Sequence, residues 1–149
     1  MKDAKLNIGC GRLKKQGYIN LDISSEVDAD IICDIRNGLP YKDNLFSEVN
    51  ADCVLEQLDN KYQFLFVMNE IWRVLIPNGI LSLTCPSAKF PCAFQDPWDN
   101  LRFTEETWSY LDENDQHYKQ FGQHYGFKPW KNIQCKTNES GIMLVIIEA

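Results

Sequence analysis

The sequence predicts an α/β fold with a mostly parallel sheet, and two observations carry that prediction. Short apolar runs recur along the first half of the chain, and they end in a glycine turn, as at Leu6–Gly11, or in a carboxylate, as at Gly17–Asp22. A helix-spaced apolar pattern over Lys61–Leu75 then precedes a further apolar run at Ile80–Cys85. Strands alternating with helical segments are typical of α/β sheets. The length suits one domain, which we expect to span residues 1–149.

Composition narrows the class of partner. The chain has 15 Lys and Arg residues against 21 Asp and Glu residues, a net charge of −6, so it lacks the long-range attraction to nucleic-acid phosphates and we expect a small-molecule partner. Its apolar runs are too short to span a bilayer and no signal peptide precedes the first strand, which predicts a cytoplasmic protein without membrane contact.

The closest pair of its six cysteines, Cys85 and Cys92, is seven residues apart, so no CxxC motif exists. We expect buried, reduced thiols and no metal site.

The first half of the chain is expected to hold four strands. They are predicted at Lys5–Ile8, Gly17–Asp22, Ala29–Ile35 and Glu48–Asp52. Only six residues separate Gly11 from Tyr18, whereas a connection between parallel strands usually takes a dozen or more. Either the crossover helix is abbreviated or these two strands are not parallel neighbours, and we favour abbreviation.

The second half is expected to open with an amphipathic helix over Lys61–Leu75. Its apolar residues recur at helical spacing along one face, namely Phe64, Met68, Ile71, Trp72 and Leu75. Pro77-Asn78-Gly79 is expected to stop this helix. The later elements are predicted as a strand at Ile80–Cys85, a long loop at Ala88–Arg102, a helical stretch capped by Thr104, broken near Asp112–Asp115 and ended by Gly126, and a hairpin of strands at Ile133–Cys135 and Gly141–Glu148.

Glycines and carboxylates gather where the predicted strands end. These residues are Gly9, Gly11, Asp22, Asp34 and Asp52. Ligands of open α/β sheets bind outside the carboxyl ends of the strands, and glycine lets the backbone approach a ligand closely. A carboxylate can accept hydrogen bonds from two adjacent ribose hydroxyls. The constellation therefore predicts a cofactor that contains a nucleoside.

The same segments carry a resemblance to a known family. Asn-Ile-Gly-Cys-Gly at 7–11, Gly-Tyr-Ile-Asn-Leu-Asp-Ile at 17–23 and Cys-Asp-Ile at 33–35 resemble the first three motifs of class I S-adenosylmethionine-dependent methyltransferases of the small bacterial methyltransferase-domain type. Segments 39–49, 54–58 and 73–79 resemble the later blocks of that family, in the right order. The resemblance implies a Rossmann-like methyltransferase fold. Its sheet would be mostly parallel and seven-stranded, with an antiparallel last strand and abbreviated early crossover helices.

The resemblance also implies a role for each site residue. Gly9 and Gly11 would lie against the methionine portion of S-adenosylmethionine, and Asp22 would bind the ribose hydroxyls. Asp34 would receive the adenine amino group and the Ile35 amide a ring nitrogen, while Ala51 and Asp52 would face the methionyl amine and the sulfonium. The full expected cofactor set is Asn7, Gly9, Cys10, Gly11, Asp22, Ile23, Asp34, Ile35, Ala51 and Asp52. No catalytic base stands out, and the candidates are Asp52, Glu56 and Asp96.

Three functions remain open at this point. The leading one is in-line transfer of a methyl group from S-adenosylmethionine to a small molecule, leaving S-adenosylhomocysteine. The second is a reduced methyltransferase-fold binding module whose cofactor site a partner chain or a second copy covers. Three features of the sequence suggest this binding module. They are the few residues before Leu6, Gln57 where the family often has His, and the lack of His in Asp96–Asn100. The third, a nicotinamide-dependent oxidoreductase, would need G-x-G-x-x-G, and Lys14 stands at the last glycine.

Overall fold

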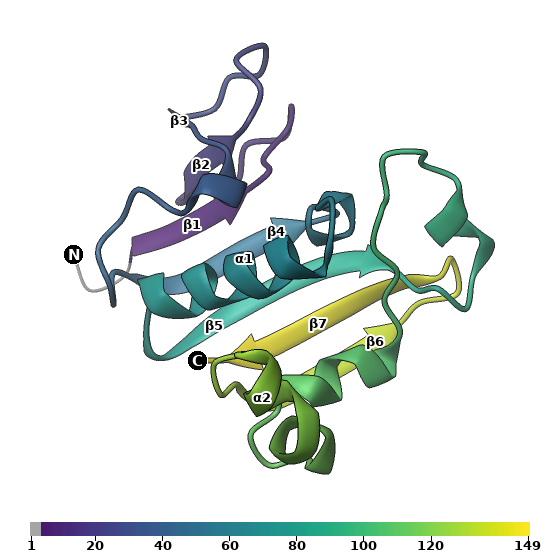
Figure 1. Cartoon of the computed structure of the whole chain (residues 1–149). Coiled ribbons are helices and arrows are strands. Elements are labelled where there is room, and N and C mark those ends of the chain that lie inside the picture. Colours follow the sequence, from purple (N-terminus) through teal and green to yellow (C-terminus); the bar gives the residue numbers. More distant parts are fainter. Residues whose placement is uncertain (1–3) are drawn as a thin grey trace.

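The computed structural model describes residues 4–149, and a seven-stranded sheet runs through it in the order β3-β2-β1-β4-β5-β7-β6 (Figure 1). The strands are β1 (Ala4–Ile8), β2 (Ile19–Asp22), β3 (Ile31–Ile32), β4 (Phe46–Asp52), β5 (Leu75–Pro86), β6 (Lys131–Thr137) and β7 (Ile142–Glu148). Neighbouring strands are parallel except where β7 pairs antiparallel with β5 and β6. The predicted mostly parallel sheet with an antiparallel last strand is confirmed. Residues 1–3, which the predicted domain includes, lie outside the described residues.

The main helix, α1 (Lys61–Val74), begins at the predicted residue. The Asn60 side chain accepts hydrogen bonds from the amides of Tyr62 and Gln63, which satisfies two of the first unpaired amides of the helix. Its buried face packs on the sheet through Phe64, Val67, Met68, Ile71 and Val74. The other helical segments are the short turns η1 (Ile35–Asn37), η2 (Leu55–Gln57), η3 (Pro91–Phe94) and η4 (Glu105–Tyr110), then η5 (Tyr118–Gly122) and α2 (Gln123–Tyr125). The predicted break near residues 112–115 separates η4 from η5.

Two predicted strands are wrong in extent. The third strand was expected over 29–35, but β3 holds only Ile31 and Ile32, both exposed at the sheet edge. The chain leaves the sheet there because the Asp34 side chain accepts from the Arg36 amide and caps η1. The fifth strand was expected over 80–85, but β5 spans Leu75–Pro86 and follows α1 directly, so Pro77-Asn78-Gly79 lies inside the strand and does not stop the helix. The register slips here, since Phe46 pairs with Leu75 but Glu48 pairs with Ile80, and a bulge absorbs the three residues.

The connection from β1 to β2 is abbreviated, as predicted, and its residues form turns without a helix. This loop lies against a row of asparagines that crosses β2, β1 and β4. Asn7 donates to Asn20 (3.0 Å), Asn50 donates to Asn7 (2.8 Å), and the Lys15 ammonium donates to Asn50 (2.8 Å). The Lys15 amide also donates to Asn20. Polar side chains and a loop therefore cover the part of the sheet where a crossover helix would pack.

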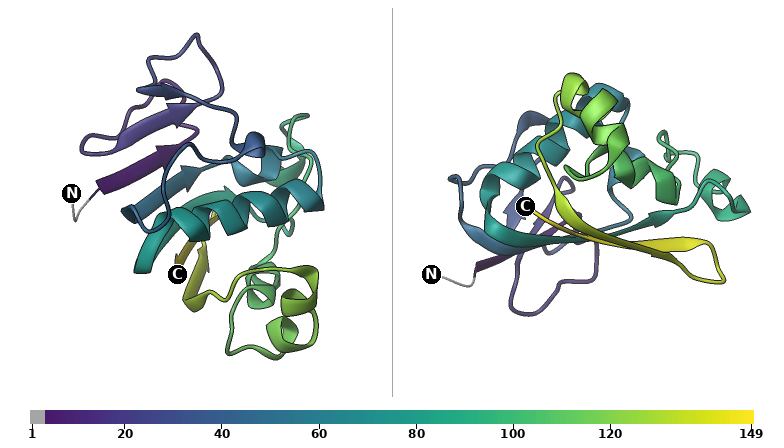
Figure 2. Two further views of the ribbon diagram at one scale, coloured as in Figure 1. Left: turned by 60° about the vertical axis from the view of Figure 1, so that its left-hand side comes forward. Right: turned by 90° about the horizontal axis from the view of Figure 1, so that it is seen from below.

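The other part of that sheet side is bare. Figure 2 shows α1 and the later helical turns on one side of the sheet, and within residues 4–149 no helix covers the opposite side. There β5 and β7 present Ile80, Ile142, Leu144 and Ile146, which alternate with fully buried residues, and Leu144 is 44% exposed. We call these four residues the open face. Sheets rich in parallel strands usually have both faces covered.

The cysteines do not all follow the prediction. Cys10 and Cys85 are buried and Cys33, Cys92 and Cys135 are half-buried, whereas Cys53 is exposed. The expectation of a buried thiol is therefore wrong for Cys53. This residue follows β4 with a φ of 52°, a turn that carries it out of the sheet.

Candidate functional site

A cavity of about 510 Å³ opens at the carboxyl ends of β1, β2 and β4. It lies where the strand order reverses between β1 and β4, the usual ligand position in open α/β sheets. Six of the predicted cofactor residues line it, namely Gly9, Gly11, Asp22, Ile23, Asp34 and Ile35. Arg36, Cys53, Val54, Gln57, Asp59 and Trp98 line it as well. Residues far apart in the sequence thus meet around one space.

The glycine turn after β1 forms one wall of the cavity. Gly9 and Gly11 both adopt left-handed backbone conformations, with φ of 66° and 52°. The amides of Gly9 and Cys10 donate to the Leu21 carbonyl at 2.8 and 3.1 Å, which fixes the turn against β2. A Cβ added to Gly9 would collide with the Val54 side chain, whereas one added to Gly11 would point into open space. Glycine is therefore required at position 9 for two separate reasons.

Asp22 is placed to accept further hydrogen bonds. Its carboxylate is buried, with Oδ2 accepting from the Gly11 amide at 2.8 Å and Oδ1 from the Ser24 amide at 2.9 Å. A carboxylate offers about four lone-pair sites, so about two remain free. Two adjacent hydroxyls of a ribose could use them. The residues present fit the nucleoside predicted for this position.

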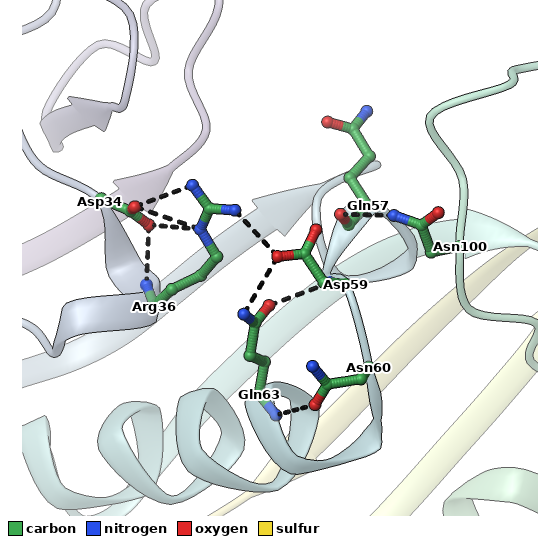
Figure 3. A network of polar contacts seen from close by, with 7 residues as sticks. All are labelled: Asp34, Arg36, Gln57, Asp59, Asn60, Gln63 and Asn100. Atoms are coloured by element: carbon green, nitrogen blue, oxygen red, sulfur yellow. Dashed lines mark hydrogen bonds and ion pairs between the residues drawn. The ribbon is translucent and has the colours of Figure 1, made fainter.

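The carboxylate oxygens of Asp34, unlike those of Asp22, accept hydrogen bonds from an arginine (Figure 3). The Arg36 guanidinium bonds to both carboxylate oxygens through Nε and Nη2, at 2.9 to 3.1 Å, and the Arg36 amide adds a fourth contact. These bonds hold the pKa of Asp34 below its ordinary value. Arg36 Nη1 also donates to Asp59 across the cavity wall at 3.1 Å. Sequence reasoning did not find Arg36 or Asp59, because an ion pair 23 residues apart leaves no local pattern.

Trp98 is not among the predicted site residues. It lines the cavity although its side chain is 72% exposed. The loop that carries it, residues 95–104 between η3 and η4, is called the Trp98 loop. It is fastened to η2, since the amides of Asn100 and Leu101 both donate to the Glu56 carbonyl at 2.8 and 2.9 Å. Asn100 donates a further bond to the Gln57 carbonyl (Figure 3). An exposed tryptophan within the predicted loop was the available signal.

The remaining predicted cofactor residues lie near the cavity without lining it. Asn7 belongs to the asparagine row, and Cys10 and Ala51 are buried. Asp52 accepts from Asn50 at 3.0 Å and from Thr84 at 3.2 Å at the end of β4. Of the candidate bases, neither Asp52 nor Glu56 nor Asp96 is a lining residue.

Glu56 nevertheless stands out chemically. Its side chain is 2% exposed, and its Oε2 has no hydrogen-bond partner among the described residues. Burial, reinforced by the nearby charges of Asp99 and Asp96, raises the pKa of Glu56 to about 7. The pKa of Asp99 is also raised, chiefly by burial. The base of the Trp98 loop therefore holds a carboxyl group that is half protonated near neutral pH.

Comparisons with known proteins agree on the architecture. No family model matches the sequence, and no curated protein does. A SAM-dependent methyltransferase from Archaeoglobus fulgidus superposes with a TM-score of 0.69 at 13% identity, covering 99% of this chain and 86% of the other. The N-methyltransferase NodS from Bradyrhizobium japonicum, solved with S-adenosyl-L-homocysteine, gives 0.65 at 14% identity, covering 98% and 77%. The chain has the fold of class I S-adenosylmethionine-dependent methyltransferases.

A third structure concerns a partner. The complex between the Haloferax volcanii Trm112 methyltransferase activator and a methyltransferase matches with a TM-score of 0.64 at 14% identity, covering 99% of this chain and 83% of the other. Within residues 4–149, no helix is both long enough and apolar enough to span a bilayer.

Proposed function

We propose that residues 1–149 form a single S-adenosylmethionine-binding domain that methylates a small molecule by in-line displacement. The observation that carries the proposal is the buried Asp22 carboxylate, which faces the cavity beside the glycine turn with about two acceptor sites free. The fold and the S-adenosyl-L-homocysteine complex of NodS support it. The net charge of −6 favours a small-molecule acceptor over a nucleic acid.

The chain's own residues would bind and orient. S-adenosylmethionine, when bound, supplies a methyl group already activated by its sulfonium. The glycine turn at Gly9 and Gly11 lets the backbone approach the cofactor, Asp22 accepts from the ribose, and Ile23 and Ile35 give apolar cover. Holding the acceptor atom in line at about 3–3.5 Å supplies much of the rate enhancement. Because none of the candidate carboxylates lines the cavity, we propose alignment rather than base catalysis as the protein's main contribution.

Asp22→Asn tests the proposal. The variant keeps one side-chain acceptor for the Gly11 and Ser24 amides but loses the charge that strengthens bonds to hydroxyls. Calorimetry with S-adenosylhomocysteine should show affinity about 10- to 100-fold weaker, or about 1.5–3 kcal/mol. Asp28→Asn removes the same charge from an exposed carboxylate and should bind as the wild type does. No heat from the wild type at millimolar ligand would refute the proposed function, and full affinity in Asp22→Asn would place the ribose elsewhere.

A second candidate function, a module that works with a second chain, is favoured by the open face. Burying Ile80, Ile142, Leu144 and Ile146 against another copy would supply the layer that this side of the sheet lacks. The complex that contains the Trm112 activator is a precedent for a partnered methyltransferase. Light scattering should find the wild type dimeric and Leu144→Glu monomeric. Phe66→Glu, at a similarly exposed position on α1, should stay dimeric, and a monomeric wild type would contradict the idea.

A further inference from the structure

Arg36 links two walls of the cavity. Its guanidinium donates through Nε and Nη2 to the carboxylate of Asp34, which follows β3. Its Nη1 donates to Asp59 Oδ2, just before α1, at 3.1 Å. We call Arg36, Asp34 and Asp59 the Arg36 latch (Figure 3). All three residues line the cavity, so any ligand that fills this end meets the latch.

The latch leaves Asp34 without a free acceptor site. The Arg36 amide and Nε contact Oδ1, and Nε and Nη2 contact Oδ2, so the four contacts use the four lone-pair sites of the carboxylate. An adenine amino group, which must donate its hydrogen bond, finds no acceptor while these bonds persist. Asp22 differs, since only two amides occupy it. Asp22 therefore has acceptor sites free for ribose hydroxyls, whereas Asp34 has none free for an adenine amino group.

We propose that Arg36 determines purine specificity as a gate: its guanidinium leaves Asp34 to admit an adenine amino group, and Asp59 retains it meanwhile. This inference rests on the proposed function. Asp59 is held ready for that task, because its amide donates to Gln63 Oε1 at 2.9 Å and Gln63 Nε2 donates back to its carboxylate at 3.1 Å. The side chains of Arg36 and Asp34 are 37% and 26% exposed, and partly exposed ion pairs are weak enough for a ligand to exchange.

The closed latch also predicts which wrong base would bind. The Arg36 guanidinium has five N–H donors and no acceptor. The bonds to Asp34 and Asp59 use three of these donors and leave two unused. A purine with a carbonyl at position 6, such as hypoxanthine, could accept from the guanidinium without opening the latch. Removing Arg36 should therefore favour adenine and disfavour hypoxanthine.

Calorimetry with S-adenosylhomocysteine and S-inosylhomocysteine tests the latch on the full chain. Arg36→Met should bind the adenosyl ligand about three- to fivefold tighter and the inosyl ligand more weakly than the wild type. Asp59→Asn, which removes the retaining carboxylate, should bind the adenosyl ligand more weakly. Adding Asp59→Asn to Arg36→Met should change nothing further. Lys42→Met, which removes an exposed positive charge outside the cavity, should match the wild type for both ligands.

The outcomes separate the latch from the proposed function. Wild-type binding of S-adenosylhomocysteine with equal or weaker binding by Arg36→Met would overturn the latch alone. Failure of every protein to bind it would overturn the proposed function and the latch together. Thermal unfolding of each variant, run beside the titrations, confirms that the proteins compared are folded.

Discussion

Gly9→Ala is expected to lower the free energy of unfolding by about 2–5 kcal/mol, because two penalties coincide at this position. A non-glycine residue in the left-handed region, where Gly9 sits at φ 66°, costs about 1–2 kcal/mol. The added Cβ would also collide with the Val54 side chain, and overpacking of this kind costs about 1–3 kcal/mol. Since the Gly9 turn and Val54 both line the cavity, S-adenosylhomocysteine binding should weaken as well.

Urea unfolding of a mutant cycle can separate the two penalties. In a Val54→Ala background the collision is relieved, so Gly9→Ala should cost only the backbone part, about 1–2 kcal/mol. Gly11→Ala is the matched control, since it has the same backbone conformation but open space around its Cβ. A cost no greater at Gly9 than at Gly11, or one that Val54→Ala does not reduce, would contradict the role given to Val54.

Much of the fold was predictable because its signals are local. The helical spacing of Phe64, Met68 and Ile71 lies within one segment, and α1 ends within one residue of the predicted Lys61–Leu75. The preference for an abbreviated connection between Gly11 and Tyr18 was also correct, since β1 and β2 pair in parallel. Such patterns do not depend on contacts with the rest of the chain.

The misjudged elements depend on tertiary context. Ile31 and Ile32 look like the middle of a buried strand, but they lie at the sheet edge where Asp34 turns the chain into η1. Pro77-Asn78-Gly79 has the composition of a helix stop, yet the pairing of β5 with β4 absorbs it as a bulge. Local composition indicates which conformation a segment prefers, but pairing with a neighbouring strand determines where the element ends.

The same division holds for the candidate site. Parallel topology predicts that glycines and carboxylates at successive strand ends lie close together. Six of the predicted residues do line one cavity. What each carboxylate bonds to did not follow. Asp22 and Asp34 look alike in the sequence, but amides hold one and Arg36 holds the other. Their readiness to bind a ligand differs for that reason alone.

Glu56→Gln is expected to remove a pH dependence of stability and to stabilise the protein above neutral pH. Burial raises the pKa of Glu56 from its ordinary 4.5 to about 7, so the folded protein binds this proton more tightly than the unfolded chain. Between about pH 4.5 and 7 the folded state holds more protons, and its stability therefore falls as pH rises through that window. A shift of this size corresponds to about 3 kcal/mol. Glutamine, which has nearly the same shape and no charge, should be more stable than the wild type by up to that amount at pH 8.

Urea unfolding at intervals from pH 5 to 8 measures this difference. Glu26→Gln removes an exposed carboxylate and should follow the wild-type profile. Asp99 is itself buried and has a raised pKa, and its charge contributes to the raised pKa of Glu56. Its titration should leave a smaller slope in Glu56→Gln, which Asp99→Asn should remove. A Glu56→Gln profile parallel to the wild type would mean that Glu56 stays ionised when folded. The expected profile would instead identify the base of the Trp98 loop as the place where protonation sets the stability of the cavity wall.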